Sequence, residues 1–396
     1  MFKKNKKTAC YECGPLPQSH VLKYIDSILE RTFPHTSNKL SFVIENTFER
    51  TLFFFGLLKK MPYSHLPEIS FRSSVFIEEG VKSGFSFWTI FGPRGPIGRF
   101  QMKKGGKTYS FEGLPRAEFL NTKESNVIDD KSKIKQILIH NELPTTQGKC
   151  FSLFGFKKAV AYGCKLGFPL VVKPRSGSIS RHVFLNIQNK DELIRALKKT
   201  FSYEPWIIIE KFLSHMKTYR ATVVDFSRIA VVERVPAHII GDGIHTIQEL
   251  IDIKNTDSKR GFPKQKNTTL YKIVINETTH SLLKKSGYSF DYVPETGNIV
   301  FLQEKVILDL GADLFEVTDK AHQDNFRLFE KTSRLFGARL IGIDFLAEDI
   351  SKSWKEQHSA VVELNSLPYI DMHHFPTSGI PVHVGRYICD LVEKYY

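Results

Sequence analysis

The stretch VVELNSLPYIDMHH, residues 361–374, is the part of the chain from which the fold prediction starts. Residues two apart in an extended strand point to the same face, so Glu363 and Asn365 are expected to lie side by side. Apolar residues precede them and Pro368 ends the run. A buried carboxylate is costly unless a positive group meets it. The stretch therefore predicts a buried strand that ends at a cation.

A second apolar stretch, LIGIDFLAED at residues 340–349, carries another acid, Asp344. Two carboxylates and an amide oxygen are hard ligands of the kind that Mg²⁺ takes when substrate phosphates complete its octahedron. One buried acid alone could be a satisfied core residue. Because two such strands follow each other, the pattern favours a metal site made of Asp344, Glu363 and Asn365.

Two earlier stretches suit a nucleotide. In FPLVVKPRSGSIS, residues 168–180, Lys173 ends an apolar strand and small residues follow, whose backbone N–H groups can close on phosphate oxygens. In PWIIIEKFL, residues 205–213, Glu210 and Lys211 interrupt an apolar run, as at the end of a strand that enters a cleft. A solvated lysine and an exposed ion pair are the alternatives.

Three regions are predicted. Residues 1–124 contain a helix at 21–33 and an aromatic β-meander between 85 and 115, with turns at GPRG and KKGGK. Residues 125–210 and 211–396 alternate helices and strands, which predicts an α+β or α/β body with a mixed sheet. The expected helices are 131–140, 156–165, 191–199, 246–254 and 325–337, and the expected strands are 168–174, 206–210, 222–226, 228–235, 340–349 and 359–365.

The composition indicates an anionic ligand without naming it. The net charge is +14, which ATP or an acidic polymer explains as well as nucleic acid does, and no nucleic-acid-binding motif occurs. No apolar run is long enough to span a membrane. Cys10 and Cys13 form a C-x-x-C without a second pair, which favours free thiols in a reducing cytoplasm over a zinc site. Whether the chain forms a homo-oligomer stays open.

Taken in order, several stretches resemble the ATP-grasp superfamily, most closely the ATP-grasp region of cyanophycin synthetase and of bifunctional glutathione synthetases. The resemblance covers about residues 125–392, and nothing similar is identified for the N-terminal third. It is carried by DDKSKIKQILIHNELPTT (129–146), FPLVVKP, WIIIEKFL, ERVPAHIIGDGIHTIQELIDIKNTDSKRG (233–261), EVTDKAHQDN (316–325), LIGIDFLAEDIS and VVELNSLPYIDMHHFPTSGIP.

The resemblance implies an α+β ATP-grasp fold with an additional N-terminal α/β domain. Residues 125–210 would form the lid and its lead-in, and residues 211–396 the central mixed β-sheet domain, with ATP clamped between them. The implied reaction activates a carboxylate as an acyl-phosphate, which an amine then attacks. Since the nucleophile is the substrate amine, no catalytic Ser or Cys is expected.

The resemblance also implies roles for single residues. Lys173 and Arg234 would be catalytic, and Mg²⁺ would be held by Asp344, Glu363 and Asn365. Contacts with ATP would come from Lys131, Lys173, Ser176, Gly177, Ser178, Glu210, Lys211, Arg220 and Arg234.

Departures from the family pattern lie mainly on the substrate side. Ser180 and His182 stand where relatives have lid glycines, Thr218 stands where they have an acid, and Gln303 and Ile307 stand where they have an arginine and an asparagine. After Pro368 the relatives' glycine and arginine are replaced by Tyr369 and Asp371. We therefore expect Tyr369, Asp371 and His373 to govern substrate choice, and no relative's substrate is transferred.

Three functions fit the sequence. The first is an ATP- and Mg²⁺-dependent carboxylate–amine ligase acting on amino acids or small peptides. The second is a nucleotide-binding regulatory protein that has lost catalysis, which the altered lid loop would suit. The third is a ligase that adds amino acids to an acidic polymer.

Overall fold

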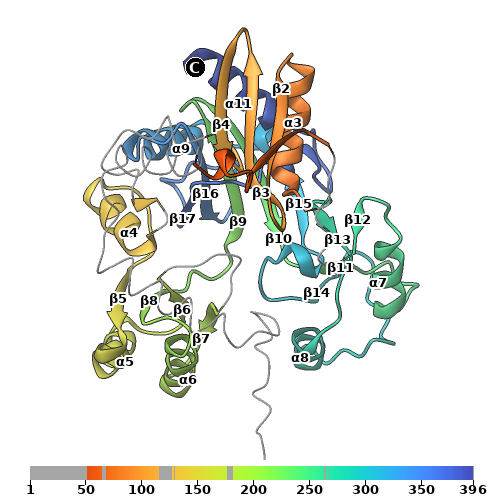
Figure 1. Ribbon diagram of the computed structural model, residues 1–396. Helices are drawn as coiled ribbons and strands as arrows, with labels where there is room; N and C mark the ends of the chain where they lie inside the picture. The colour runs from red at the N-terminus through yellow and green to blue at the C-terminus, as the bar shows by residue number, and fades with distance from the viewer. Residues whose placement is uncertain are drawn as a thin grey trace, which may run out of the picture. The chain divides into compact units, whose positions relative to one another are not determined.

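The computed structural model describes residues 51–64, 68–115, 127–128, 130–175, 182–262, 265 and 267–395. The described residues form two compact units: those between 130 and 215, and those between 51 and 128 together with those from 216 to 395 (Figure 1). The helix predicted at residues 21–33 and the pair Cys10 and Cys13 lie outside the described residues.

The first unit is a four-stranded antiparallel sheet with the order β5-β8-β6-β7. Its core is aliphatic, with Leu170, Leu193 and Ile207 fully buried. The helices predicted for this unit are confirmed to within about two residues. The elements are α4 (Lys131–His140), β5 (Gly148–Ser152), α5 (Phe156–Leu166), β6 (Leu170–Pro174), β7 (Phe184–Ile187), α6 (Lys190–Phe201) and β8 (Trp206–Lys211).

The second unit contains a five-stranded sheet with the order β15-β10-β9-β16-β17. The α+β class is confirmed, but the pairings in this sheet are antiparallel and not mixed as predicted. One reason is local: Asp225 and Phe226, predicted as strand, have φ values of 47° and 67° and turn the chain into a hairpin. The strands are β9 (Lys217–Val224), β10 (Arg228–Val235), β15 (Asp313–Glu316), β16 (Leu340–Ala347) and β17 (Ser359–Asn365).

The predicted meander is present and packs within this second unit. Its turn at Gly105 and Gly106 has φ values of 56° and 81°, which glycine adopts without strain. The elements are β1 (Lys59–Pro62), α3 (Phe71–Lys82), β2 (Ser86–Gly92), β3 (Gly95–Lys104), β4 (Lys107–Glu112) and the C-terminal α11 (Val384–Tyr395). Buried residues of α3, β2, β3, β4 and α11 form one core with Val224 and Leu340 of the central sheet. The boundary predicted at residue 124 therefore does not separate two cores.

A smaller cluster in the second unit has its own apolar core, which includes Ile239, Ile251 and Leu302. Its elements are β11 (His238–Ile240), α7 (Ile247–Asn255), β12 (Arg260–Gly261), β13 (Leu270–Tyr271), α8 (Glu277–Lys285) and β14 (Ile299–Phe301). Helix α7 begins at a capping box formed by Thr246 and Glu249. The unit is completed by α9 (Gln323–Leu335) and α10 (Asp371–His374). No helix in the described ranges is long and apolar enough to cross a membrane.

Candidate active site

In the first unit, Glu210 of β8 is the centre of a buried charged cluster. Strand β6 lies beside β8 and brings the Lys173 ammonium into contact with one Glu210 oxygen. The Lys135 ammonium lies 2.9 Å from Oε2, and the Thr146 hydroxyl donates to the same oxygen at 2.6 Å. All four residues are buried. Burial opposes the ionisation of Glu210, but the charges of Lys173 and Lys135 outweigh it and lower its pKa to about 2.

Sequence reasoning missed Lys135 and Thr146. Lys135 lies one helical turn after Lys131 in α4, so the i, i+4 spacing already places both lysines on one helix face. Burial lowers the pKa of Lys135, while Glu210 opposes that shift. The cluster therefore holds two ammonium groups against one carboxylate, which leaves an excess of positive charge for an anion.

Lys211 and the loop after β6 are the remaining predicted ATP contacts of this unit. The Lys211 ammonium donates to the backbone oxygens of Gly167 and Phe168, at 3.1 and 2.8 Å. The backbone N–H of Lys211 donates to the Gln147 oxygen and is therefore not available to hydrogen-bond the adenine base of ATP. The predicted phosphate contacts Ser176, Gly177 and Ser178 lie outside the described residues.

In the second unit, Asp344 of β16 is held by two arginines. Arg220 Nε lies 2.5 Å and Arg234 Nη2 3.0 Å from its Oδ1. Burial opposes ionisation, but the two guanidinium groups keep the pKa of Asp344 below its usual range. Both of these contacts fall on Oδ1. The sequence pattern predicts a metal that balances this acid, whereas in the structure two arginines already do so.

The register of β16 and β17 brings the three predicted metal ligands together. Glu363 lies directly opposite Asp344, and Asn365 lies opposite Gly342, two residues away on each strand. The Asn365 Nδ2 atom is buried without a hydrogen-bond partner. The side-chain oxygens of Asp344, Glu363 and Asn365 are hard ligands, a donor set that fits Mg²⁺.

The three predicted substrate residues have different environments. Tyr369 is 41% exposed, and the Arg72 guanidinium lies 4.8 Å from its ring centroid. Asp371 is buried, accepts from the Thr269 hydroxyl at 2.8 Å and leaves Oδ1 unpaired, and burial raises its pKa. The prediction that His373 contacts a substrate does not agree with its environment, which is fully buried.

His373 is fully buried, and its two ring nitrogens are already engaged. Nδ1 lies 3.0 Å from Glu316 Oε2, and Nε2 lies 2.8 Å from Thr222 Oγ1. It therefore ties α10 to the central sheet and is not exposed to a substrate.

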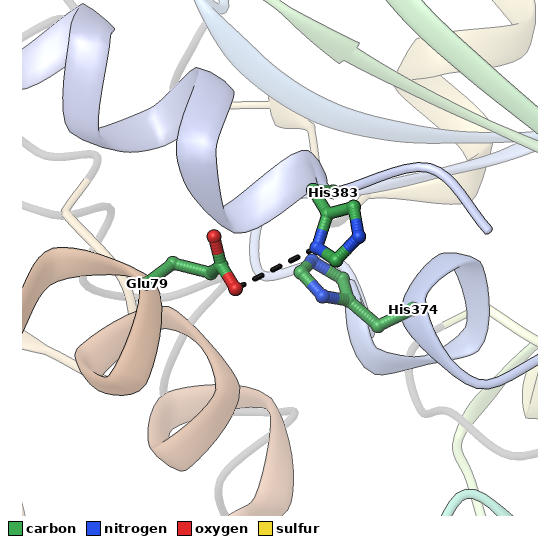
Figure 2. Close-up of side chains that lie close together, drawn as sticks. All are labelled: Glu79, His374 and His383. Carbon is green, nitrogen blue, oxygen red and sulfur yellow. Dashed lines mark ion pairs between the residues drawn. The ribbon is translucent and has the colours of Figure 1, made fainter. Parts of the chain in front are cut away.

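A further group of ligand-type side chains joins α3 to the C-terminal segment. One atom from each of Glu79, His374 and His383 lies within 4.8 Å of the others (Figure 2). Lys82 donates to Glu79 at 2.9 Å, and the Gly385 N–H donates to His374 Nε2 at 3.0 Å. Because these hydrogen bonds engage Glu79 Oε1 and His374 Nε2, and His383 Nδ1 lies 3.5 Å from the same Glu79 oxygen, we interpret the group as a structural tie.

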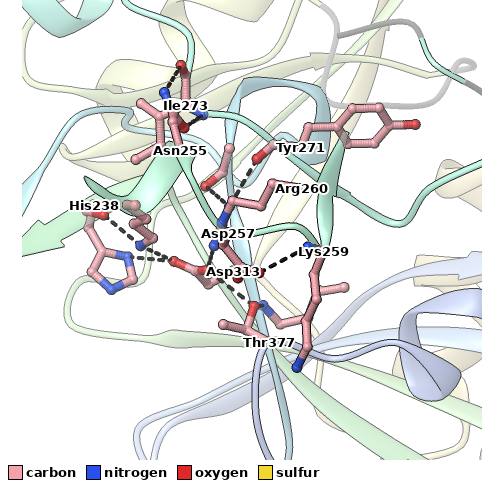
Figure 3. Close-up of polar contacts among 12 residues, drawn as sticks. His238, Asn255, Asp257, Lys259, Arg260, Tyr271, Ile273, Asp313 and Thr377 are labelled. Carbon is pink, nitrogen blue, oxygen red and sulfur yellow. Dashed lines mark hydrogen bonds and ion pairs between the residues drawn. The ribbon is translucent and has the colours of Figure 1, made fainter. Parts of the chain in front are cut away.

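Asp313 organises the polar network next to β12. It accepts from the Lys254 ammonium at 2.5 Å and the Thr377 hydroxyl at 3.1 Å, and pairs with the Arg260 guanidinium (Figure 3). His238 Nδ1 lies 3.4 Å from it. These positive groups lower the pKa of Asp313 against the effect of burial. The network anchors Arg260 and Gly261, which end the family-like stretch 233–261. The sequence did not indicate that these charged residues form a cluster.

Comparisons with known proteins agree with this arrangement. Residues of this chain are 33% identical over 264 positions to cyanophycin synthetase of Trichormus variabilis, covering 66% of this chain and 29% of that protein. They are 30% identical over 268 positions to the glutathione biosynthesis bifunctional protein of Clostridium perfringens, covering 67% and 34%. The chain thus matches about a third of the length of these curated relatives.

The fold is also found among solved structures. A bifunctional glutathione synthetase from Pasteurella multocida matches with a TM-score of 0.62 and 22% identity, over 83% of this chain and 45% of that one. No model of a protein family matches the chain. The motifs, the relatives and the shared fold agree with one another, and the chain belongs to the ATP-grasp superfamily.

Proposed function

We propose that this protein is an ATP- and Mg²⁺-dependent carboxylate–amine ligase that forms an amide bond through an acyl-phosphate and releases ADP and phosphate. The observation that carries the proposal is the pairing of β16 with β17, which sets Asp344 opposite Glu363 and beside Asn365, with two arginines on Asp344. The names of the relatives, two of them synthetases of amide-bonded products, support it.

The residues proposed to hold ATP are cationic where phosphates are expected. Lys173 and Lys135 exceed Glu210 by one positive charge, and Lys131 begins the same helix as Lys135. Mg²⁺ would be held by Asp344, Glu363 and Asn365, and when bound it would neutralise phosphate charge and polarise the transferred group. The Ser176–Ser178 loop and Lys211 stay proposed ATP contacts.

The arginines are proposed to act on the acyl-phosphate. Arg234 and Arg220 lie on neighbouring strands, and the buried Nε of Arg234 and Nη1 of Arg220 have no hydrogen-bond partner. Buried unpaired donors of this kind stabilise negative charge that develops during reaction, because they are already oriented and need no reorganisation. Tyr369 and Asp371 stay proposed substrate contacts, and the cytoplasm, where ATP is plentiful, stays the proposed location.

An enzyme assay tests this proposal. The purified protein is incubated with ATP, Mg²⁺ and a panel of amino acids and short peptides, and ADP and phosphate are measured. We expect ADP formation that depends on the amine, and a loss of at least about 100-fold in Asp344→Asn, as expected when a preoriented charge is removed. The matched control is Asp319→Asn, an exposed acid of the same unit, which should keep full activity.

A second candidate function is nucleotide binding without turnover. One observation favours it: the charge of Asp344 is neutralised by Arg220 and Arg234 within the protein. It predicts that nucleotide binding persists unchanged in Asp344→Ala and that no amine on the panel promotes ADP formation. Amine-dependent turnover would exclude it.

A further inference from the structure

A cleft of about 660 Å³ lies in the second unit beside β12 and β13. Its volume is within the range of ligand-binding pockets. The walls combine aromatic rings, hydroxyl and amide groups, and three cationic side chains against one acid, Asp257. Phe262 and Phe375 are 65% and 45% exposed on it. A wall of this kind suits an extended ligand that is partly apolar and negatively charged.

The charges on the cleft are not equivalent. Arg260 is paired with Asp313 and is therefore neutralised within the protein (Figure 3). Lys259 and Lys272, by contrast, have ammonium groups without a carboxylate partner among the residues that the structure describes. The Lys272 ammonium lies 4.3 Å from the centroid of the Phe262 ring, which positions it at an aromatic wall. Two ammonium groups without an ion-pair partner in the described part of the chain therefore lie on a single cleft that carries one carboxylate, Asp257.

The strands beside the cleft are held in place by side-chain contacts. Arg260 donates to the Tyr271 oxygen at 2.9 Å and pairs with Asp313, which fixes β12 against β13. The cleft also adjoins the proposed substrate side, because Thr269 on its wall donates to Asp371 at 2.8 Å. A ligand in the cleft would thus lie next to the segment that follows the proposed metal ligand Asn365.

We propose that this cleft binds an acidic peptide segment, with carboxylates paired to Lys259 and Lys272 and aliphatic parts on Phe262 and Phe375. The proposal rests on the proposed ligase function, for which it names the substrate class: a peptide that carries several carboxylates. A peptide is favoured over nucleic acid because the cleft offers two unpaired ammonium groups and not a continuous row that follows a phosphate backbone.

Binding is tested with the full chain and a fluorescein-labelled decaglutamate peptide, by fluorescence anisotropy at low salt and without nucleotide. The variant is Lys259→Gln/Lys272→Gln. The matched control is Lys320→Gln/Lys331→Gln, two exposed lysines of the same unit outside the cleft. We expect binding about tenfold weaker in the cleft variant and unchanged in the control, since each lost charge pair contributes modestly. Equal melting temperatures show that both variants are folded.

Three results would overturn the proposal: no binding of decaglutamate by the unmodified protein, an equal loss in both double variants, or binding of a ten-nucleotide single-stranded DNA at least as tight as that of the peptide. A Gly-Ser peptide of the same length should not bind. ADP formation is measured on the same preparations. If turnover persists without peptide binding, the cleft proposal alone fails; if peptide binding persists without turnover on any substrate, the ligase proposal fails.

Discussion

At the scale of single residues, Glu210 has the most demanding environment. It is 3% exposed and ionised, and its charge is stabilised by Lys135, Lys173 and Thr146 within one sheet. The carboxylate in turn allows two ammonium groups to be buried. The cluster therefore balances its own charges except for one excess positive charge, the feature that is proposed to attract the phosphates of ATP.

Glu210→Gln is expected to destabilise the protein by about 3–5 kcal/mol, because it leaves two buried ammonium groups without a counter-charge. The free energy of unfolding is measured by urea denaturation. The control is Glu348→Gln, an exposed acid beside His358, which should change it by less than about 0.5 kcal/mol. Equal effects of the two substitutions would show that the Glu210 charge does not stabilise the fold.

His374 gives the fold a defined response to acid. Burial, together with His383, lowers its pKa from about 6.5 to about 3, so the native state excludes a proton that the unfolded chain binds. Stability should therefore fall as the pH drops from about 6.5 towards 3, by up to about 1.4 kcal/mol per pH unit. In His374→Gln the slope should decrease, whereas in the exposed His358→Gln it should not. A slope that is unchanged in His374→Gln would refute this reading.

At the scale of elements, strand pairing decides where the charges lie. Gly148 of β5 sits opposite Glu210, where a Cβ would come within 2.6 Å of the Ile209 backbone oxygen. Gly148→Ala should therefore destabilise the unit by about 1–3 kcal/mol and weaken ATP binding by displacing Glu210. Gly155→Ala, whose Cβ would meet nothing closer than 3.9 Å, is the control. Thermal melting and calorimetric ATP titration of both variants check the prediction, which fails if they behave alike.

Much of the element level could be predicted because it depends on local sequence. The periodicity of residues 131–140 gave a helix with the bounds now found, and the β16–β17 pair was expected from its two acids. The partners of those acids were not predictable in the same way. Arg220 reaches Asp344 from 124 positions away, and His373 reaches Thr222 across 151, so their roles depend on packing that no local pattern encodes.

At the scale of the whole molecule, the segment 51–115 is not a separate domain but shares a hydrophobic core with the central sheet. Phe76, Phe100 and Phe111 of this segment belong to the same core as Leu340 and Ile388. A large shared core of this kind folds cooperatively, since its apolar surface is buried only when both parts are present.

A chain that begins at residue 125 is therefore expected to be largely insoluble or to melt without a cooperative transition. Circular dichroism during heating, and the soluble fraction after expression, measure this. The control is a chain that begins at residue 51, which keeps every core residue named here and should melt cooperatively. A sharp melt of the shorter chain would contradict the shared core and restore the predicted boundary at residue 124.

The central claim is that this chain activates a carboxylate with ATP. It is tested most directly by supplying the substrate found on the panel with ¹⁸O in its carboxylate and analysing the released phosphate by mass spectrometry. The account predicts ADP as the nucleotide product and one ¹⁸O atom transferred to each phosphate, because the acyl-phosphate oxygen leaves with phosphorus when the amine attacks. Unlabelled phosphate, or release of AMP and pyrophosphate, would contradict it.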